Sequence, residues 1–242
     1  MNCIVCSDDK YKTVLAKDGF ELVKCENDGH IFLLNPPEIK ELTKYYDKTY
    51  FKGKKGYRTN QTNQENNQKK ISRAKRRAEK ITQKSTGNRL LDVGCGLDIF
   101  LETINKHSWF DGFGVDISEY VKQGRKNVWI GDFNDYPAKG FDIITMFSYL
   151  EHTINPIKSL NTAYNKLKEN GKLVISLPNI NGLPCQIMGA SWRGYSFPEH
   201  IHFFNKDNLY TILDRAGFEP IKPKFSENNF FRDTNYFYAK KK

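Results

Sequence analysis

The sequence of 242 residues contains no apolar run that approaches the roughly 20 residues needed to span a bilayer. Its opening stretch, MNCIVCSDDKYK, has no apolar core of the kind found in secretory signals. We therefore expect a cytoplasmic protein without a membrane span. Hydrophobic residues make up 38% of the chain and aromatic residues 14%, which argues against disorder and allows one α/β domain with a small appendage.

Acidic residues are fewer than basic ones, since 28 Asp and Glu against 38 Lys and Arg give a formal net charge of +10. This excess suits an anionic partner, such as nucleic acid, a phosphorylated small molecule, a nucleotide-linked sugar or a membrane surface. Much of it lies in Lys69–Lys84 and Lys240–Lys242. Solvated surface explains both clusters without any partner, and we favour that interpretation.

Cysteine is also scarce. The chain has five cysteines and no export signal, so we expect no disulfide framework. Three of the five lie within the first 25 residues, which indicates a metal site. Cys3 and Cys6 form a Cys-x-x-Cys knuckle, a tight turn that aims two thiolates at one ion. Cys25 lies where the second knuckle of a zinc ribbon would begin.

The fourth ligand of such a site is not a cysteine. Asp28 stands three residues after Cys25, and His30 stands two residues further on. Zinc accepts thiolate, imidazole and carboxylate ligands, so Asp28 or His30 can complete a tetrahedral site with the three cysteines. The alternative is a ribbon that has no metal and is stabilised by packing alone. We expect residues 1–37 to form a zinc-ribbon-like segment in which any zinc is structural, because a closed four-ligand site has no open position for chemistry.

Residues 38–88 are expected to form a helical and mobile linker. Helical spacing of apolar residues in Pro37–Phe51 predicts a short packing helix, and the polar stretch Gly53–Asn67 predicts a mobile segment. Lys69–Lys84 predicts a basic helix. Its sparse apolar stripe consists of Ile71, Ala74, Ala78 and Ile81. This helix either covers an active site or an anion, or it leans on the sheet as a surface helix, and we favour the second interpretation.

The stretch Arg89–Phe100, RLLDVGCGLDIF, predicts a buried strand, a turn built on Gly94 and Gly96, and the start of a helix. This arrangement presents backbone N–H groups to a bound cofactor. Alternating strand-like and helix-like segments follow, which predicts an α/β sheet whose last two strands form an antiparallel edge. We expect further strands at 112–118, 127–133, within 141–152 (which holds a strand and the loop after it), 172–179, 218–225 and 234–240. We expect helices at 100–106, 119–125, 155–169 and 209–216.

The glycine turn does not fit a dinucleotide. The fingerprint Gly-x-Gly-x-x-Gly needs a glycine where this chain has Ile99, and a side chain there leaves no room for a pyrophosphate. A cofactor without phosphates fits better. Asp116 follows Gly96 by about twenty residues, the separation at which an acidic side chain accepts both ribose hydroxyls.

Together, LDVGCG, Asp116 and the pair Asp132-Phe133 resemble class I S-adenosylmethionine-dependent methyltransferases. The resemblance implies a Rossmann-like α/β sheet with an antiparallel last strand in a domain of residues 89–242. It implies that the glycine turn backs the methionine part, that Asp116 binds the ribose, and that Asp132 meets the adenine amino group with Phe133 beside the ring. The cofactor-binding residues it implies are Asp92, Gly94, Cys95, Gly96, Asp116, Ile117, Asp132, Phe133 and Phe147.

The turn departs from the family at Asp98, where a third glycine is usual. Asp tolerates the left-handed backbone region better than most residues, so the turn can survive the replacement, and the Asp98 side chain then either crowds or contacts the methionine end. The cysteine-containing ribbon resembles one found in a subgroup of bacterial methyltransferases of small molecules and sugars.

In this family the acceptor lies over the carboxyl ends of strands four and five. A base is needed only if the acceptor must lose a proton, and histidine is the natural base because it titrates nearest neutral pH. The catalytic candidates are Glu151, His152, His200 and His202, and the substrate-binding candidates are Tyr149, Trp192, Arg193 and Tyr195. His152 has the alternative role of ordering its loop. His200 and His202 occupy alternate positions of an extended segment and are expected to point the same way, one as the base and the other ordering a lid.

Arg193 is the candidate for gripping a phosphate or carboxylate of the acceptor, whereas Trp192 and Tyr195 alternatively only wall the pocket. In relatives that methylate quinone precursors, Glu-x-x-Glu-His binds a divalent metal. The first Glu of that motif is Ser148 in this chain, so we predict no metal there.

The sequence thus predicts an enzyme that transfers a methyl group from S-adenosylmethionine to an oxygen or nitrogen of a small anionic or sugar-like acceptor. A sugar or a phosphorylated precursor of a surface polysaccharide is the expected substrate class. One alternative is an RNA methyltransferase, favoured by the charge but lacking an aromatic-studded RNA-binding module. The other is a non-catalytic protein that binds the cofactor, suggested by Asp98.

Overall fold

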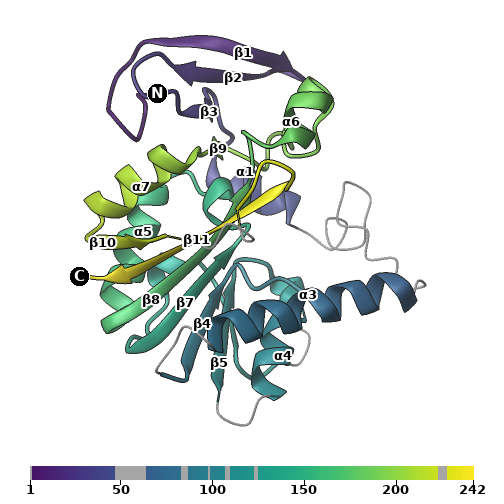
Figure 1. The fold of residues 1–242 in the computed structure, drawn as a ribbon, viewed down its shortest axis with the longest axis vertical. Helices are drawn as coiled ribbons and strands as arrows, with labels where there is room; N and C mark the ends of the chain where they lie inside the picture. The colour runs from purple at the N-terminus through teal and green to yellow at the C-terminus, as the bar shows by residue number, and fades with distance from the viewer. Residues whose placement is uncertain are drawn as a thin grey trace.

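The computed structural model describes residues 2–46, 64–82, 87–97, 99–106, 110–122, 125–222 and 228–242. Asp98 and most of the segment predicted to be mobile, Gly53–Asn67, lie outside these residues. The described chain forms a seven-stranded sheet with helices on both faces and a separate four-stranded sheet. Figure 1 shows the small sheet, at the top, beyond the carboxyl ends of the parallel strands of the large one.

The large sheet has the strand order β10-β11-β8-β7-β4-β5-β6. Its strands are β4 (Arg89–Val93), β5 (Asp111–Asp116), β6 (Val128–Ile130), β7 (Phe141–Phe147), β8 (Leu167–Pro178), β10 (Phe218–Ile221) and β11 (Thr234–Lys241). Strands β4 to β8 pair in parallel, and β11 runs antiparallel to both of its neighbours. The predicted fold class is therefore confirmed. The strand order reverses between β4 and β7, which is the position where open α/β sheets bind ligands.

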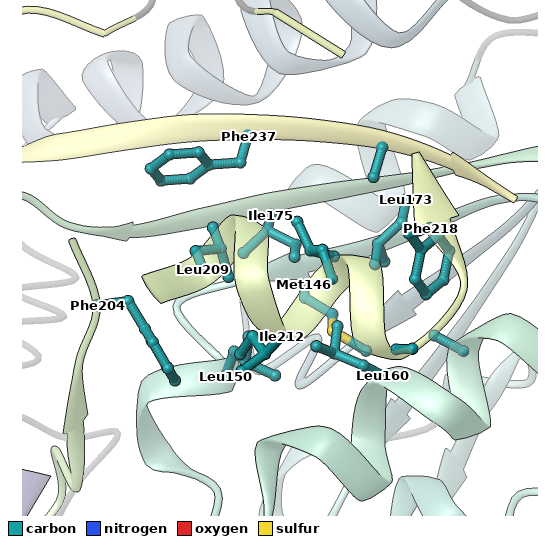
Figure 2. Close-up of a cluster of buried hydrophobic side chains, with 14 of the residues drawn as sticks. Met146, Leu150, Leu160, Leu173, Ile175, Phe204, Leu209, Ile212, Phe218 and Phe237 are labelled. Atoms are coloured by element: carbon teal, nitrogen blue, oxygen red, sulfur yellow. The ribbon is translucent and has the colours of Figure 1, made fainter. Parts of the chain in front are cut away.

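Helices cover both faces of this sheet because successive strand residues point to opposite sides. Leu90 and Ile143 pack in one cluster with Phe100 of α4 (Phe100–Lys106) and with α3 (Gln64–Thr82). Their neighbours Leu91 and Ile144 pack on the other face, with α5 (Pro156–Lys166) and α7 (Lys206–Arg215). Figure 2 shows this second cluster, in which Leu160, Leu209 and Ile212 lie against Met146, Leu173 and Ile175.

The basic helix α3 leans on the sheet, as the favoured interpretation predicts. Ala74, Ala78 and Ile81 are buried against β4 and α4, whereas Ile71 is 42% exposed and does not belong to the packed stripe. The helix begins at Gln64, inside the stretch predicted to be mobile. That prediction is wrong for 64–67, because these polar residues extend the helix without the apolar periodicity by which it was recognised.

Other boundaries also differ from the predictions. Strand β8 begins at Leu167, where the sequence predicts a helix to Glu169, and it accommodates the left-handed Asn170 within an irregular pairing with β7. The helix predicted at 119–125 is a single 3₁₀ turn, η1 (Glu119–Val121), in the part the structure describes. Among the α-helices and strands of the described residues, α6 (Leu183–Met188) and β9 (His202–Phe203) were not predicted.

The small sheet joins the N-terminal residues to the methyltransferase-like part of the chain. Its strands β1 (Tyr11–Lys17), β2 (Phe20–Cys25), β3 (Ile31–Leu33) and β9 follow one another in antiparallel pairs. The short helix α1 (Ile39–Tyr45) follows β3, within the range predicted for a packing helix. The ribbon is thus completed by a strand that lies far along the chain, which the pattern of the first 37 residues did not indicate.

Candidate active site

The glycine turn follows β4 in the left-handed backbone region. Gly94 has φ of 68° and Gly96 has φ of 48°, values that side chains rarely allow. A Cβ atom at Gly94 would also lie 2.9 Å from Cδ2 of Tyr149. Tyr149, predicted to bind substrate, therefore packs directly against the turn that is predicted to bind the cofactor.

Asp116 stabilises this turn from the end of β5. Its Oδ2 accepts a hydrogen bond of 2.9 Å from the amide of Gly96, and its Oδ1 accepts one of the same length from the amide of Ser118. Burial raises the pKa of this carboxyl above its ordinary value, although both hydrogen bonds oppose the rise. Each oxygen keeps further acceptor capacity for a ligand. The next residue, Ile117, is 39% exposed and offers an apolar surface beside it.

Two polar side chains hydrogen-bond to residues of β4 and the glycine turn, of which Thr145 is buried and Arg125 is half-buried. Thr145 on β7 donates a hydrogen bond of 2.6 Å from Oγ1 to Oδ1 of Asp92, and Arg125 donates one of 2.8 Å from Nη1 to the carbonyl of Gly96. Cys95 is buried in an apolar cluster, and burial raises the pKa of its thiol. Cys95 therefore has only its backbone available for a cofactor. Thr145 and Arg125 were not predicted, because no short motif marks them.

Asp132 and Phe133 form the predicted adenine side, and Phe147 is a further predicted cofactor-binding residue. Asp132 caps the 3₁₀ turn η2 (Phe133–Asp135) by accepting a hydrogen bond of 2.8 Å from the amide of Asn134. Phe133 is buried, with its ring edge-on to Tyr149 at 6.1 Å between centroids. Phe147 is half-buried beneath the guanidinium of Arg77, which lies 4.2 Å from the ring centroid. Phe133 thus supports the site from the core rather than presenting an exposed face.

Glu151, His152 and His200 come together after β7, where Glu151 and His152 belong to the 3₁₀ turn η3 (Leu150–His152). One ligand atom from each residue lies within 4.8 Å of the others. The two imidazole rings meet edge-on, with centroids 4.5 Å apart and an interplanar angle of 85°. A carboxyl and two imidazoles at this spacing are close enough to share a proton or to ligate one cation, and the absence of a metal here stays a prediction.

The hydrogen bonds of the two imidazoles indicate their tautomers. Nδ1 of His152 lies 2.8 Å from the carbonyl oxygen of Glu199, and Nδ1 of His200 lies 2.7 Å from that of Gly194. Because a carbonyl oxygen only accepts, each Nδ1 carries the proton and each Nε2 has the lone pair when the ring is neutral. Burial lowers the pKa of both histidines, that of His200 to about 4, so both rings are neutral at neutral pH.

Glu151 is buried, and neither of its carboxylate oxygens has a hydrogen-bond partner among the described residues. Burial raises its pKa to about 8, so the carboxyl is protonated at neutral pH. Tyr46, at the end of α1, lies beside this group: its Oη is 2.9 Å from Nδ1 of His152, and its carbonyl accepts a hydrogen bond of 2.7 Å from Ser118. Tyr46 was assigned to packing from its helical spacing, and it joins the acceptor side to the Asp116 side.

His202 has different surroundings from His200. It is fully buried, and its Nδ1 lies 3.2 Å from Nε2 of His30, on which it stacks at 5.3 Å. His30 is therefore paired with His202 and does not join the cysteines. The pairing of β9 with β3 brings the two rings together, because Phe32 opposes His202 in the register.

Asp233, which was not predicted as a site residue, contacts Trp192 and Arg193 directly, and Tyr195 packs against Trp192. Trp192 is buried and donates a hydrogen bond of 3.0 Å from Nε1 to Oδ1 of Asp233, while Arg193 forms an ion pair with Oδ2. The Arg193 side chain is 78% exposed. Tyr195 lies edge-on to Trp192 at 5.2 Å. Arg193 thus already has a carboxylate partner, and the two aromatic residues form a wall.

Cys3, Cys6, Cys25 and Asp28 form a second cluster whose ligand atoms lie within 4.8 Å of one another. Sγ of Cys6 is 3.5 Å from Sγ of Cys25, and Sγ of Cys3 is 3.3 Å from Oδ2 of Asp28. Ideal zinc bond lengths in a tetrahedron separate two sulfurs by about 3.8 Å and a sulfur from an oxygen by about 3.6 Å. The two separations agree within a few tenths of an ångström, so the donor set fits zinc with Asp28, not His30, as the fourth ligand.

Comparison with known proteins agrees with this architecture. The profile of a methyltransferase domain family matches residues 63–222, which is more than half of the chain. The chain belongs to this methyltransferase family. Its fold is that of class I S-adenosylmethionine-dependent methyltransferases. Within the described residues, every helix is too short or too polar to cross a membrane.

The methyltransferase is similar to two proteins named ubiquinone biosynthesis O-methyltransferase. The one from Cereibacter sphaeroides is 28% identical over 156 residues, which cover 57% of this chain and 63% of that protein. The one from Coxiella burnetii is 32% identical over 175 residues, covering 61% and 74%. The chain thus spans less than two thirds of the first relative. The crystal structure of magnesium protoporphyrin IX methyltransferase from Synechocystis with bound SAH matches 85% of this chain and all of that one, with a TM-score of 0.61 at 16% identity.

Proposed function

We propose that this methyltransferase methylates a hydroxyl oxygen of a small acceptor that binds over His152 and His200. The observation that supports the proposal is the pair of neutral imidazoles, whose Nδ1 protons are bound to carbonyls and whose Nε2 atoms can therefore accept a proton. A hydroxyl must lose its proton as it attacks, whereas a free amine need not. The relatives named O-methyltransferases support the same choice. Sugars and phosphorylated sugar precursors belong to this hydroxylated class, but the pairing of Arg193 with Asp233 gives an anionic group no unpaired cation at that position.

Bound S-adenosylmethionine supplies an electrophilic methyl group. In the proposal, Asp116 accepts hydrogen bonds from the ribose hydroxyls, and Asp132 accepts one from the adenine amino group. The amides of the glycine turn and the side chain of Asp92 face the methionine part. Nε2 of His200 or His152 takes the hydroxyl proton as the acceptor oxygen bonds to the methyl carbon. The carbon–sulfur bond breaks in the same step, and its electron pair leaves with the sulfur as a neutral thioether. Alignment of the two reactants contributes much of the rate of such a displacement.

A methylation screen tests this function. The purified chain is incubated with labelled S-adenosylmethionine and separate panels of phenols and catechols, nucleotide sugars, small amines and tRNA. We expect methyl transfer to a hydroxylated small molecule, lost in His152→Gln and His200→Gln. Transfer to amines that survives both substitutions would contradict the role of the imidazoles. Transfer to tRNA, with affinity that falls steeply with salt, would support the RNA alternative. In calorimetry, no heat of binding at millimolar S-adenosylmethionine would contradict the enzyme function. Binding of the cofactor without methyl transfer to any panel would support the non-catalytic alternative.

For the ribbon, we propose a structural zinc ion held by Cys3, Cys6, Cys25 and Asp28. Metal analysis after gentle purification is expected to give one zinc per chain, and Cys6→Ser is expected to lose it. Cys185→Ser, which changes another buried thiol outside the cluster, is the matched control and should keep the metal. Less than stoichiometric zinc in the unmodified chain after incubation with zinc would contradict the proposal.

A further inference from the structure

Ile201, the residue after His200, links the acceptor site to the ribbon through the hydrogen bonds of its own backbone. Ile201 is fully buried, and its amide donates a hydrogen bond of 2.8 Å to the carbonyl of Glu151 in the acceptor site. Its carbonyl accepts a hydrogen bond of the same length from the amide of Leu33 in the ribbon. A single peptide segment thus connects the ribbon to the turn that positions the catalytic candidates.

The next two residues belong to the ribbon sheet itself. Strand β9 lies beside β3 (Figure 1). In the register of this pair, Phe203 opposes Ile31 and His202 opposes Phe32. His30 stacks on Phe32 and on Phe204 and contacts His202, so buried rings lock the strand in place. Since β9 has two residues, most of what fixes it comes from the ribbon rather than from its own length.

The ribbon end of this connection is the cysteine cluster. The amide of Cys25 donates a hydrogen bond of 2.8 Å to the carbonyl of His30, and the amide of His30 donates one of 2.8 Å to Oδ1 of Asp28. Cys25 and Asp28, the proposed ligands of the second knuckle, therefore both hydrogen-bond to the backbone of His30, and the His30 side chain contacts His202 of β9. Asn208 of α7 also donates a hydrogen bond of 3.0 Å to the carbonyl of Asp28, which anchors the knuckle to the large domain.

We propose that the metal-closed ribbon positions His200 against His152, with His30 and His202 as positioning residues that act through β9 and Ile201. The proposal rests on the zinc and acceptor sites proposed above. It makes the ribbon part of the acceptor site rather than an independent accessory domain. Without the metal, Cys25 and Asp28 would no longer be held in place, and neither would His30, which they position. The segment 199–204 would then lose its support, whereas the glycine turn and Asp116 would keep their structure.

Hydrogen exchange of the full-length chain tests the connection, because exchange reports local opening. The zinc-loaded chain is compared with the same chain after zinc is removed with a chelator. We expect amides in 199–204 to exchange at least about tenfold faster without zinc, and amides of β4 to keep their protection. Side-chain ¹H–¹⁵N spectra should show shifted Nδ1 and Nε2 signals of His152 and His200. Ribbon amides that exchange faster while 199–204 and both histidine signals stay unchanged would overturn the proposal.

Variants separate this effect from general unfolding. Asp28→Cys supplies a thiolate in place of the carboxylate and should keep zinc, the protection of 199–204 and the histidine signals. His30→Phe should keep zinc but shift the His200 signals, because it removes the contact with His202 while retaining a ring. A chain that binds no zinc, or a His30→Phe variant with unchanged His200 signals, would overturn the proposal. Calorimetry with S-adenosylmethionine distinguishes failure of the proposed function from failure of this proposal. If the zinc-loaded chain does not bind the cofactor, the proposed function is refuted, whereas the exchange result still tests the connection.

Discussion

Asp116 uses both carboxylate oxygens on the backbone around the glycine turn, one on Gly96 and one on Ser118. We predict that Asp116→Ala weakens S-adenosylmethionine binding by about 10- to 100-fold, since a hydrogen bond to a charged group contributes about 1.5–3 kcal/mol. Calorimetry measures the change. Asp111→Ala, at the other end of β5 and exposed, is the control and should bind normally. Equal affinities in the two variants would mean that the acid does not meet the ribose.

The low pKa of His200 predicts an unusual pH profile. A general base works in its neutral form, and burial lowers the pKa of His200 to about 4. The rate of hydroxyl methylation should therefore stay level as the pH falls from 7 to 5.5 and decline only on approaching about 4. His200→Gln should lower kcat by about 10²-fold or more and leave cofactor affinity unchanged. An acid limb near the ordinary histidine pKa of about 6.5 would argue for a different, exposed base.

A site residue could be predicted from the sequence where a local motif fixes its backbone position. It could not be predicted where the residue reaches the site from a distant part of the chain. Gly94 and Gly96 are recognisable because they form the turn after the first core strand, and Asp116 because it is the acidic residue at the end of the second. Tyr46 and Asp233 approach the site from elements far away in the chain, and nothing in their neighbourhoods marks them. Spacing left two candidates for the fourth ligand. The position of Asp28 beside the three thiols and the pairing of His30 with His202 both favour Asp28.

Among the elements, α3 gives the sharpest stability prediction. Ala78 is fully buried between the helix and the sheet, whereas Lys75 on the same helix is exposed. Ala78→Glu should lower the free energy of unfolding by about 2–4 kcal/mol, because it buries a carboxyl without a partner. Lys75→Glu should change it by less than about 0.5 kcal/mol. Urea denaturation measures both, and similar midpoints for the two variants would contradict the packing of α3.

Elements with strong local periodicity were predictable, and short ones were not. Helix α4 has the predicted bounds, and the strands around the glycine turn lie where apolar runs predict them. Strand β9 has two residues and no period to detect. Its existence depends on β3, which is more than a hundred residues earlier, so only the folded chain reveals it.

At the level of the whole molecule, buried titratable groups predict how stability depends on pH. Burial lowers the pKa of His30, His152, His200 and His202, so the folded state binds fewer protons there than the unfolded state below about pH 6.5. Glu151, with a pKa raised to about 8, opposes them by holding a proton in the folded state only. Asp116, whose pKa burial also raises, opposes the histidines in the same way, whereas the lowered pKa values of Asp28 and Asp142 act in the same direction as the histidines. The four histidines outweigh the two carboxyls of raised pKa, so the free energy of unfolding should fall as the pH falls from 6.5 towards 4.

Two variants test this balance because they change it in opposite directions. His202→Gln should make the pH dependence shallower by about one proton, or about 1.4 kcal/mol per pH unit, and Glu151→Gln should make it steeper by the same amount. Urea denaturation at pH 5, 5.5, 6 and 6.5 measures the slopes. Stability that is level over this range in the unmodified chain, or slopes that move in the same direction in both variants, would contradict the burial of these groups.

The pairing of β3 with β9 also bears on how the chain folds as it is synthesised. Ile31 and its partner Phe203 are separated by 172 positions, so the ribbon lacks its fourth strand until most of the chain has been made. At about 5–20 residues per second this delay lasts roughly 10–35 s. Closing so long a loop costs about 4–5 kcal/mol in chain entropy, which the large sheet must largely offset by folding first. The ribbon strands β1 to β3 are translated well before β9 and are therefore among the last to reach their final structure, and the β3 edge stays unpaired until then.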